Sequence, residues 1–471
     1  MPADPAPTTR SDTRPVDVDV AIVGAGPAGV PAALAAARAG ATVAVIDAAE
    51  RPGGQYHRQL PQSFEVEDPG ALHHGWRAAT AGFDELAADE RIRHIAGTRV
   101  WLAERSSAGV TLHTTGAHRG TVRAQALILA TGAAERVLPF PGWDLPGVLT
   151  VGAAQALVKG QGVRPGHRVV VAGTGALLLA SASTLVRAGT QVVEVLDANG
   201  PGTWRAAGPR VLAPGTAVEA AGYRRDRARS RTPYRPAQAI IAATGEGRVE
   251  SVTIAQVDRD WHVVDGTQRH LDVDAVCVAY GFSPNVGIAA ALGCGLTPGG
   301  GPAVEVDRLQ RTTTPRVFAA GEVTGIAGAD VAALEGAVAG AAAADACGHD
   351  VDRALVRRQV RRREKAQRFA AALQRATPIR HGWQSWLTDD TIVCRCEEVE
   401  LATVRSAIAG AGVRDVRSLK MTTRCGMGWC QAAICGPNVV DLLTVATGAV
   451  PEDANRLAAR SIAEPVALSE L

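Results

Sequence analysis

The chain of 471 residues is long enough for two or three domains, each with its own hydrophobic core. Its 49 basic and 47 acidic residues leave a formal net charge of only +2, which argues against nucleic acid as a partner. Hydrophobic residues make up 46% of the chain, which excludes a largely disordered protein. No run of about 18 apolar residues occurs, and Glu335 interrupts the Ala-rich stretch at 332–346, so we expect no membrane-spanning segment.

Residues 1–15 are rich in Pro, Thr and Asp, and we expect a disordered tail there. They lack the apolar core that a secretory signal needs, so we expect a cytoplasmic protein. In that compartment clustered cysteines are more often metal ligands than disulfides.

Residues 16–46 predict a strand, a glycine turn, a helix and a second strand, which together make a βαβ unit. The GxGxxG spacing allows a tight turn, the approach of a pyrophosphate and close packing of helix on strand. The phosphates would meet free N–H groups at the start of the helix. An acid roughly 20 residues further on would bind a ribose. The predicted site comprises Gly24, Gly26, Pro27, Ala28, Gly29 and Asp47.

A second βαβ unit is predicted at residues 168–197. It keeps Gly173 and Gly175, but Leu178 replaces the third glycine, so the helix must pack farther from the strand. Asp197 would favour an unphosphorylated ribose, and therefore NAD over NADP. Three interpretations stay open here: productive NAD(P)H binding, structural binding of an adenine nucleotide, or no ligand.

The part of the chain that contains the two βαβ units has few residues suited to acid–base or thiol chemistry. Its isolated cysteines, Cys277 and Cys294, and the later Cys347 cannot form the paired thiol of a disulfide reductase. Cys277 lies in an apolar strand and is expected in the core. The titratable candidates are the three histidines His57, His73 and His74, which we expect to be surface or supporting residues. The catalytic residues are therefore left unassigned.

Three further segments identify the dinucleotide. ERPGGQ (50–55), the ATG at 130–132 and VFAAGE (317–322) resemble the two-dinucleotide-binding flavoproteins. The resemblance implies that the first site holds FAD, although many members have Asp where this chain has Glu322. It adds these cofactor-binding residues: Gly53, Gly54, Gln55, Thr131, Gly132, Gly321 and Glu322.

The segment at 351–377 is charged and predicts a linker helix. Its arginines, densest between residues 353 and 368, indicate the solvated face of that helix or a docking surface for a partner subunit.

Five cysteines lie between residues 394 and 435. CxC at Cys394 and Cys396, followed by TRCGMGWCQAAIC (423–435), resembles the bacterioferritin-associated-ferredoxin-like [2Fe-2S] domain. The resemblance implies four cluster ligands. Cys425 falls on a variable position of the motif and is expected to be a neighbour, with a substitute-ligand role as the alternative. Structural zinc is a second alternative, although zinc sites usually take close CxxC-type pairs. The implied ligands are Cys394, Cys396, Cys430 and Cys435.

The segments at 130–150, 321–336 and 390–399 together resemble one family, over residues 16–445. It comprises the FAD- and [2Fe-2S]-containing α (A) subunits of heteromeric amine dehydrogenases, such as opine oxidase, D-hydroxyproline and L-proline dehydrogenases and hydrogen cyanide synthase. The resemblance implies an electron-transferring subunit of an enzyme that oxidises the C–N bond of an amino acid, imino acid or opine. It implies as partner an FAD-containing β subunit that resembles D-amino-acid oxidase; a small ferredoxin-like subunit is a further candidate. The alternatives are a stand-alone NAD(P)H-dependent FAD/iron–sulfur reductase and a non-enzymatic redox-sensing or assembly protein.

The expected fold is therefore α/β, with two Rossmann-like domains, the first discontinuous, and a small, mainly helical [2Fe-2S] domain at the C-terminus. The predicted bounds are 1–15 for the tail, 16–150 and 276–350 for the FAD domain, 151–275 for the second nucleotide domain, 351–388 for the linker helix, 389–450 for the [2Fe-2S] domain and 451–471 for a tail.

Overall fold

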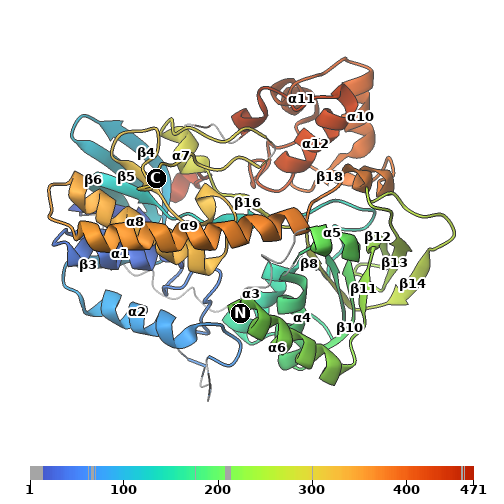
Figure 1. Cartoon of the computed structure of the whole chain (residues 1–471). Coiled ribbons are helices and arrows are strands. Elements are labelled where there is room, and N and C mark those ends of the chain that lie inside the picture. The colour runs from blue at the N-terminus through green and yellow to red at the C-terminus, as the bar shows by residue number, and fades with distance from the viewer. Residues whose placement is uncertain are drawn as a thin grey trace, which may run out of the picture.

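The computed structural model describes residues 14–61, 63–64, 68, 70–175, 177–206, 214–299, 301–457, 460 and 462–470. Most of the tail expected at 1–15 therefore lies outside the described residues. The rest forms two α/β domains side by side, with a helical domain at the C-terminus (Figure 1). This is the fold class that the sequence predicted.

The first domain is built on a seven-stranded sheet in the order β3-β2-β1-β6-β5-β4, with β17 paired to β6. β1, β2 and β3 run parallel, as a βαβ unit requires, and β5 pairs antiparallel with β6. Because β17 comes from much later in the chain, this domain is discontinuous. The strands are β1 (Val16–Val23), β2 (Val43–Ile46), β3 (Ile92–Ile95), β4 (Thr98–Ser106), β5 (Gly109–Gly116), β6 (Gly120–Leu129) and β17 (Val317–Ala319).

Two glycines allow α1 (Gly29–Arg38) and α8 (Ala329–Ala346) to pack closely, because they place no side chain between the two helices. A Cβ atom on Gly336 would lie 1.9 Å from the carbonyl oxygen of Ala28, and one on Gly340 would lie 2.1 Å from that of Ala32. The two helix backbones therefore touch. This contact fixes α1, whose N-terminus faces the first glycine turn.

The second domain contains a five-stranded sheet in the order β11-β10-β9-β15-β8 and an antiparallel three-stranded sheet, β12-β13-β14. β15 pairs with β9 and β8, so it belongs to this sheet, whereas the expected bounds had ended the domain at residue 275. The other bounds stay predictions. The elements are β8 (Val148–Thr150), α3 (Val151–Gln161), β9 (Arg168–Gly173), α4 (Leu177–Arg187), β10 (Gln191–Asp197), α5 (Pro201–Ala206), α6 (Pro214–Ser230), β11 (Tyr234–Pro236), β12 (Gln238–Thr244), β13 (Ser251–Gln256), β14 (Arg269–Asp272) and β15 (Ala275–Ala279).

Shorter elements complete the two domains. β7 and β16 form a small antiparallel pair at the junction between the two larger sheets. Their bounds and those of the remaining elements are α2 (Trp76–Ala88), β7 (Ala133–Glu135), β16 (Phe282–Pro284), α7 (Gly287–Ala291) and η2 (Glu322–Thr324).

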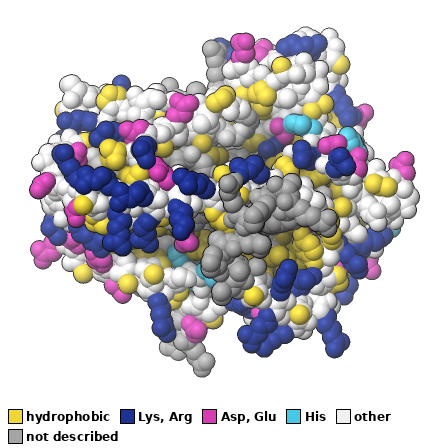
Figure 2. Space-filling model, in the orientation of Figure 1, with side chains coloured by type: hydrophobic (Ala, Val, Ile, Leu, Met, Phe, Trp, Pro, Cys, Tyr) yellow, Lys and Arg dark blue, Asp and Glu magenta, His cyan; other side chains and the backbone are white. Residues whose placement is uncertain are grey.

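A single long helix, α9 (Arg353–Ala376), begins at Asp352, whose side chain accepts hydrogen bonds from the first-turn N–H groups of Ala354 and Leu355. It packs along α8, and its arginines form a band of positive charge on the visible face (Figure 2). Arg363 is an exception, because it is buried and donates to Arg308 O and Gln310 Oε1. The helix then leads through η3 (His381–Trp386) to the cysteine domain.

The cysteine domain shares a hydrophobic core with the second domain. Trp261 and Tyr280 pack in the same cluster as Trp383, Trp386 and Leu401. No helix in the described part of the chain is long and apolar enough to cross a membrane. The elements here are β18 (Ile392–Cys394), β19 (Val399–Glu400), α10 (Leu401–Ala409), α11 (Val416–Thr423), α12 (Gly436–Thr447), η4 (Ala454–Leu457) and η5 (Leu468–Glu470).

The segment after α12 returns to the first domain. Ala463 N donates to Trp101 O, and Thr115 Oγ1 donates to Glu470 Oε2. The expected C-terminal tail therefore packs against the first sheet where it is described.

We predict that Gly340→Ala destabilises the protein by about 1–3 kcal/mol, because the added methyl group overpacks the contact between α1 and α8. The matched control is Gly222→Ala in α6, where a Cβ would meet no atom within 4 Å. There the better helix propensity of Ala should stabilise by up to about 1 kcal/mol. Denaturant unfolding followed by circular dichroism measures both; equal effects would contradict the close-contact account.

Candidate functional site

One connected cavity of about 4010 Å³ runs between the two α/β domains and reaches the cysteine domain. Small-molecule pockets are commonly about 300–1,000 Å³, so this space accommodates an extended dinucleotide with room to spare. All the predicted FAD residues except Gly29 lie on its wall. Gly29 faces inward, where a Cβ would lie 1.7 Å from the carbonyl oxygen of Gly24. That close approach of helix and strand is the role expected of the third glycine.

The first glycine turn has the features of a phosphate cradle. Gly24 has φ +106°, and a Cβ there would lie 2.3 Å from Ala130 O. Gly26 faces Gly54 across the cavity wall, and its own Cβ would meet only the Cα of Gly54, at 3.8 Å. Helix α1 begins without a side-chain cap, and although Val30 N donates to Gly26 O, the positive end of the helix still faces the turn where a phosphate would bind. The residues present therefore fit a bound pyrophosphate.

Asp47 follows β2 and holds the turn in place. Its Oδ2 accepts a hydrogen bond from Ala25 N, and its Oδ1 accepts one from Ala49 N at 2.7 Å. Each carboxylate oxygen can accept more than one bond, so capacity remains for a ribose hydroxyl.

A buried acid that sequence reasoning left without a role supports the turn at 321–324, which lies against Ala28 of the first glycine turn. Glu335 on α8 is 2% exposed, and its Oε2 accepts from Gly321 N at 2.8 Å and from Thr324 Oγ1 at 3.0 Å. Its Oε1 accepts from Gln367 on α9 at 2.8 Å. Burial raises the pKa of Glu335 and also that of Glu322. A lone acid in an Ala-rich helix was the available signal for this residue.

Thr131 and Glu135 order the cavity wall between the two domains. Thr131 Oγ1 donates to Asn285 O at 2.7 Å. Glu135 Oε1 accepts from Gly152 N at 2.8 Å, in the first turn of α3, and burial raises the pKa of this carboxyl. Glu135 was also missed from the sequence, although it closely follows the ATG segment.

The three histidines gather on one side of the cavity. His57 Nε2 contacts His74 O at 3.0 Å, and His73 stacks on Trp76 with ring centroids 4.6 Å apart. Burial lowers the pKa of His57 and lowers that of His73 to about 4. Burial likewise lowers the pKa of Lys159, on α3, to about 8. Burial therefore favours the neutral forms of His57 and His73, and the buried Nδ1 of His73 has no hydrogen-bond partner among the described residues.

The glycine turn of the second domain is approached by the chain's own linker. A Cβ on Gly175 would lie 3.8 Å from the Cγ2 of Thr377, which directly follows α9. Asn199, buried just after β10, donates to Thr174 Oγ1 and, at 3.1 Å, to Pro378 O. The segment after α9 is thus fastened over this turn.

Asp197, the expected ribose ligand of the second site, is 1% exposed. Its Oδ2 accepts from Tyr234 Oη at 2.7 Å, and its Oδ1 accepts from Asn199 N at 2.9 Å. Trp261 Nε1 completes the network by donating to Asn199 Oδ1. The carboxylate of Asp197 is therefore already hydrogen-bonded to groups of the protein itself.

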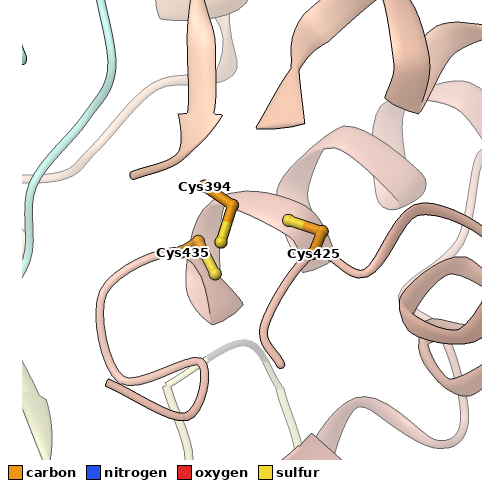
Figure 3. Close-up of side chains that lie close together, drawn as sticks. All are labelled: Cys394, Cys425 and Cys435. Atoms are coloured by element: carbon orange, nitrogen blue, oxygen red, sulfur yellow. The ribbon is translucent and has the colours of Figure 1, made fainter. Parts of the chain in front are cut away.

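The cysteines converge from three elements. The Sγ atoms of Cys394, Cys425 and Cys435 lie within 4.8 Å of one another, and Figure 3 shows the three side chains pointing to a common point. Hydrogen bonds from the thiols of Cys425 and Cys435 lower the pKa of Cys394 to about 2. Cys396 and Cys430 form a second contact pair beside this group. The chain thus offers enough thiolates for an iron–sulfur cluster.

The cluster loop and the glycine turn share one cavity. Cys430 lies on its wall together with Trp429, Gln431 and Gly436, and Trp429 is 70% exposed. The loop at 281–288, which lies beside the predicted FAD residues, lines the same space. The two candidate redox sites therefore face each other through a continuous opening.

Two protein families match the chain. Residues 18–336 match the family described as "Pyridine nucleotide-disulphide oxidoreductase", and residues 392–444 match the "BFD-like [2Fe-2S] binding domain".

Curated relatives match nearly the whole chain. An opine oxidase subunit of Rhizobium meliloti is 32% identical, over 98% of this chain and 89% of its own length. Hydrogen cyanide synthase subunit HcnB of Pseudomonas aeruginosa is 31% identical, over 91% of this chain and 93% of its own. Among solved structures, L-proline dehydrogenase from P. horikoshii has the same fold, with a TM-score of 0.69 at 21% identity, over 98% of this chain and 81% of that one.

The cofactors are therefore FAD and a [2Fe-2S] cluster, as the sequence predicted. The relatives are subunits of multi-subunit enzymes, which implies partner subunits. By the matches over nearly its full length, the chain belongs to the pyridine nucleotide-disulphide oxidoreductase family, in the branch of HcnB and the matching opine oxidase subunits, and is an FAD-dependent oxidoreductase.

Proposed function

We propose that this chain is the electron-transferring FAD/[2Fe-2S] subunit of an enzyme that oxidises the C–N bond of an amino acid, imino acid or opine. The observation that carries the proposal is the single cavity whose wall contains both the first glycine turn and Cys430. Oxidation of the substrate takes place on a partner, an FAD-containing β subunit that resembles D-amino-acid oxidase; a small ferredoxin-like subunit is a further partner. A cytoplasmic location stays a prediction.

The proposed FAD contacts are the glycine turn, Asp47, the segment at 53–55, Thr131, Gly132 and the Gly321–Glu322 turn. The proposed cluster ligands are Cys394, Cys396, Cys430 and Cys435. FAD exchanges electrons in pairs or singly, whereas the cluster carries one at a time. The chain's own residues hold these groups: uncapped N–H groups of α1 bind phosphate, Asp47 orients the ribose, and Glu335 fixes the turn at Gly321.

The polar groups of the cavity support electron transfer over acid–base catalysis. Glu135 is occupied by the first turn of α3, Glu335 by the turn at 321–324, and His57 by a backbone contact, whereas His73 is stacked on Trp76 and its Nδ1 has no partner among the described residues. An electron-transferring subunit needs positioned cofactors and needs no proton-transferring side chain.

The contacts at the second nucleotide site favour a function in which the electrons come from a partner subunit. Asp197 is bonded to Tyr234, and Thr377 and Pro378 lie over the glycine turn. Thr174 and Gly175 line the same cavity, so a nicotinamide dinucleotide bound at this turn would lie directly against Thr377. The rival function, a stand-alone NAD(P)H-dependent reductase, needs that site open.

We predict that the chain purified with its partner subunits is reduced by substrate under anaerobic conditions, whereas the isolated chain is not. Proline, hydroxyproline, sarcosine and an opine are the compounds to test, and absorbance of flavin and cluster is the readout. Dithionite serves as the positive control. Reduction of the isolated chain by any of these compounds would count against the proposal, and so would a complex that only dithionite reduces.

Replacement of Cys430 by Ala should remove the cluster and leave FAD bound, because the ligand lies in the cysteine domain, away from the glycine turn. Iron content and the flavin spectrum measure the two cofactors independently. Cys347→Ala is the matched control, since its thiol lies outside the cysteine domain and donates to Asp19 O, at 3.4 Å. A full complement of iron in Cys430→Ala would refute this ligand.

Gly26→Leu should abolish FAD binding without unfolding the chain. A Cβ at this position has room, and the rest of the side chain would occupy the space of the pyrophosphate. Gly202→Leu, at an exposed position of α5 where a Cβ meets no atom within 4 Å, is the control. The flavin-to-protein ratio after gel filtration decides the matter, and a fully loaded Gly26→Leu protein would show that FAD lies elsewhere.

A further inference from the structure

Cys425 has no part in the four-ligand set proposed above, yet its thiol lies inside the cysteine pocket. Its Sγ is within 4.8 Å of those of Cys394 and Cys435, and all three residues are buried (Figure 3). Cys394 ends β18, Cys425 follows α11, and Cys435 directly precedes α12. Three separate elements therefore deliver thiols to one point.

The position of Cys425 is fixed by its local backbone. Cys425 N donates to Thr423 Oγ1 at 3.1 Å. The two flanking residues, Arg424 and Gly426, both have positive φ, at +66° and +87°. Arg424 is held in turn by Glu397, at 2.8 Å. The turn thus aims the thiol inward rather than leaving it free to rotate toward solvent.

The other end of the pocket holds only two thiols. Cys396 and Cys430 interact with each other, and Cys396 is exposed whereas Cys430 is half-buried. Cys435 also contacts Cys430 and so joins the two ends. The pocket therefore has a buried end with three thiols and an exposed end with two.

The five thiols of the pocket are one more than a [2Fe-2S] cluster requires. The cluster takes four cysteine ligands, two for each iron. The exposed end supplies its pair with none to spare, and the buried end supplies one thiol more than its iron needs. The proposed ligand set contains Cys394 and Cys435, so the extra thiol at this end is Cys425.

We propose that Cys425 is a reserve iron ligand at the buried end. When Cys394 is lost or dissociates, the Cys425 thiolate binds the same iron in its place. The exposed end has no reserve. This inference rests on the ligand set proposed above and adds an asymmetry to it that the four-cysteine motif does not contain.

The test compares two single variants of the same type, Cys394→Ala and Cys396→Ala, with the double variant Cys394→Ala/Cys425→Ala. Alanine is used because a serine oxygen can itself bind iron. Iron and sulfide content, visible absorption and the EPR spectrum of the dithionite-reduced protein are measured, with flavin content as the control for folding. We expect Cys394→Ala to keep most of its iron with a shifted EPR spectrum, and Cys396→Ala and the double variant to lose the cluster.

Loss of the cluster from Cys394→Ala with FAD retained would overturn the reserve role, and so would a cluster that survives in the double variant. A second measurement does not depend on the folding of Cys394→Ala: Cys425→Ala should assemble a full cluster but release iron to a chelator faster than wild type. Equal release rates would also overturn the inference. A wild-type chain that holds no cluster would instead contradict the proposed function.

Discussion

The attachment of the cysteine domain to the flavin domain is the contact on which the rest of the arrangement depends. Electrons can pass between two cofactors only if the protein holds them close together. Polar contacts between the described residues do this: Asn438 Nδ2 donates to Val137 O at 2.7 Å, Trp143 Nε1 donates to Ile392 O at 2.7 Å, Arg395 Nη2 donates to Asp144 O at 3.3 Å, and Arg136 pairs with Asp441. All join the segment after the ATG turn to the cysteine domain. A shared apolar core around Trp261 and Trp383 attaches the cysteine domain to the second domain as well.

Helix α9 is a second connection, because it links the turn at Gly321 in the first domain to the segment over the second glycine turn. Gln367 on its inner face bonds Glu335, which fixes the turn at Gly321, and its C-terminal end leads into the segment over the second glycine turn. The first nucleotide site is thus supported by α9 and the second is covered by the residues that follow it. Both glycine turns line the cavity, but only the second is contacted by the segment that follows α9, so two domains built on the same βαβ plan differ in their surroundings.

Local geometry explains why so much could be predicted from the sequence. Gly24 and Gly29 are needed where a Cβ would strike a backbone oxygen, and that need leaves a fixed spacing in the chain. The cysteine motif could likewise be recognised because its cysteines occur at a fixed spacing in the chain. The convergence of Cys425 with Cys394 and Cys435 depends on how β18 and the ends of α11 and α12 pack, so the motif alone left it as a neighbour. The bonds of Asp197 to Tyr234 and of Asn199 to Pro378 join residues 37 and 179 positions apart, and no short pattern contains them.

The central claim is that electrons enter this chain from a partner and not from a nicotinamide. The most direct test mixes the purified chain anaerobically with NADH and then with NADPH and follows the absorbance of flavin and cluster. The account predicts no bleaching by either nucleotide in a sample that dithionite reduces fully. Rapid bleaching by either one would contradict it and would make the chain a self-sufficient reductase.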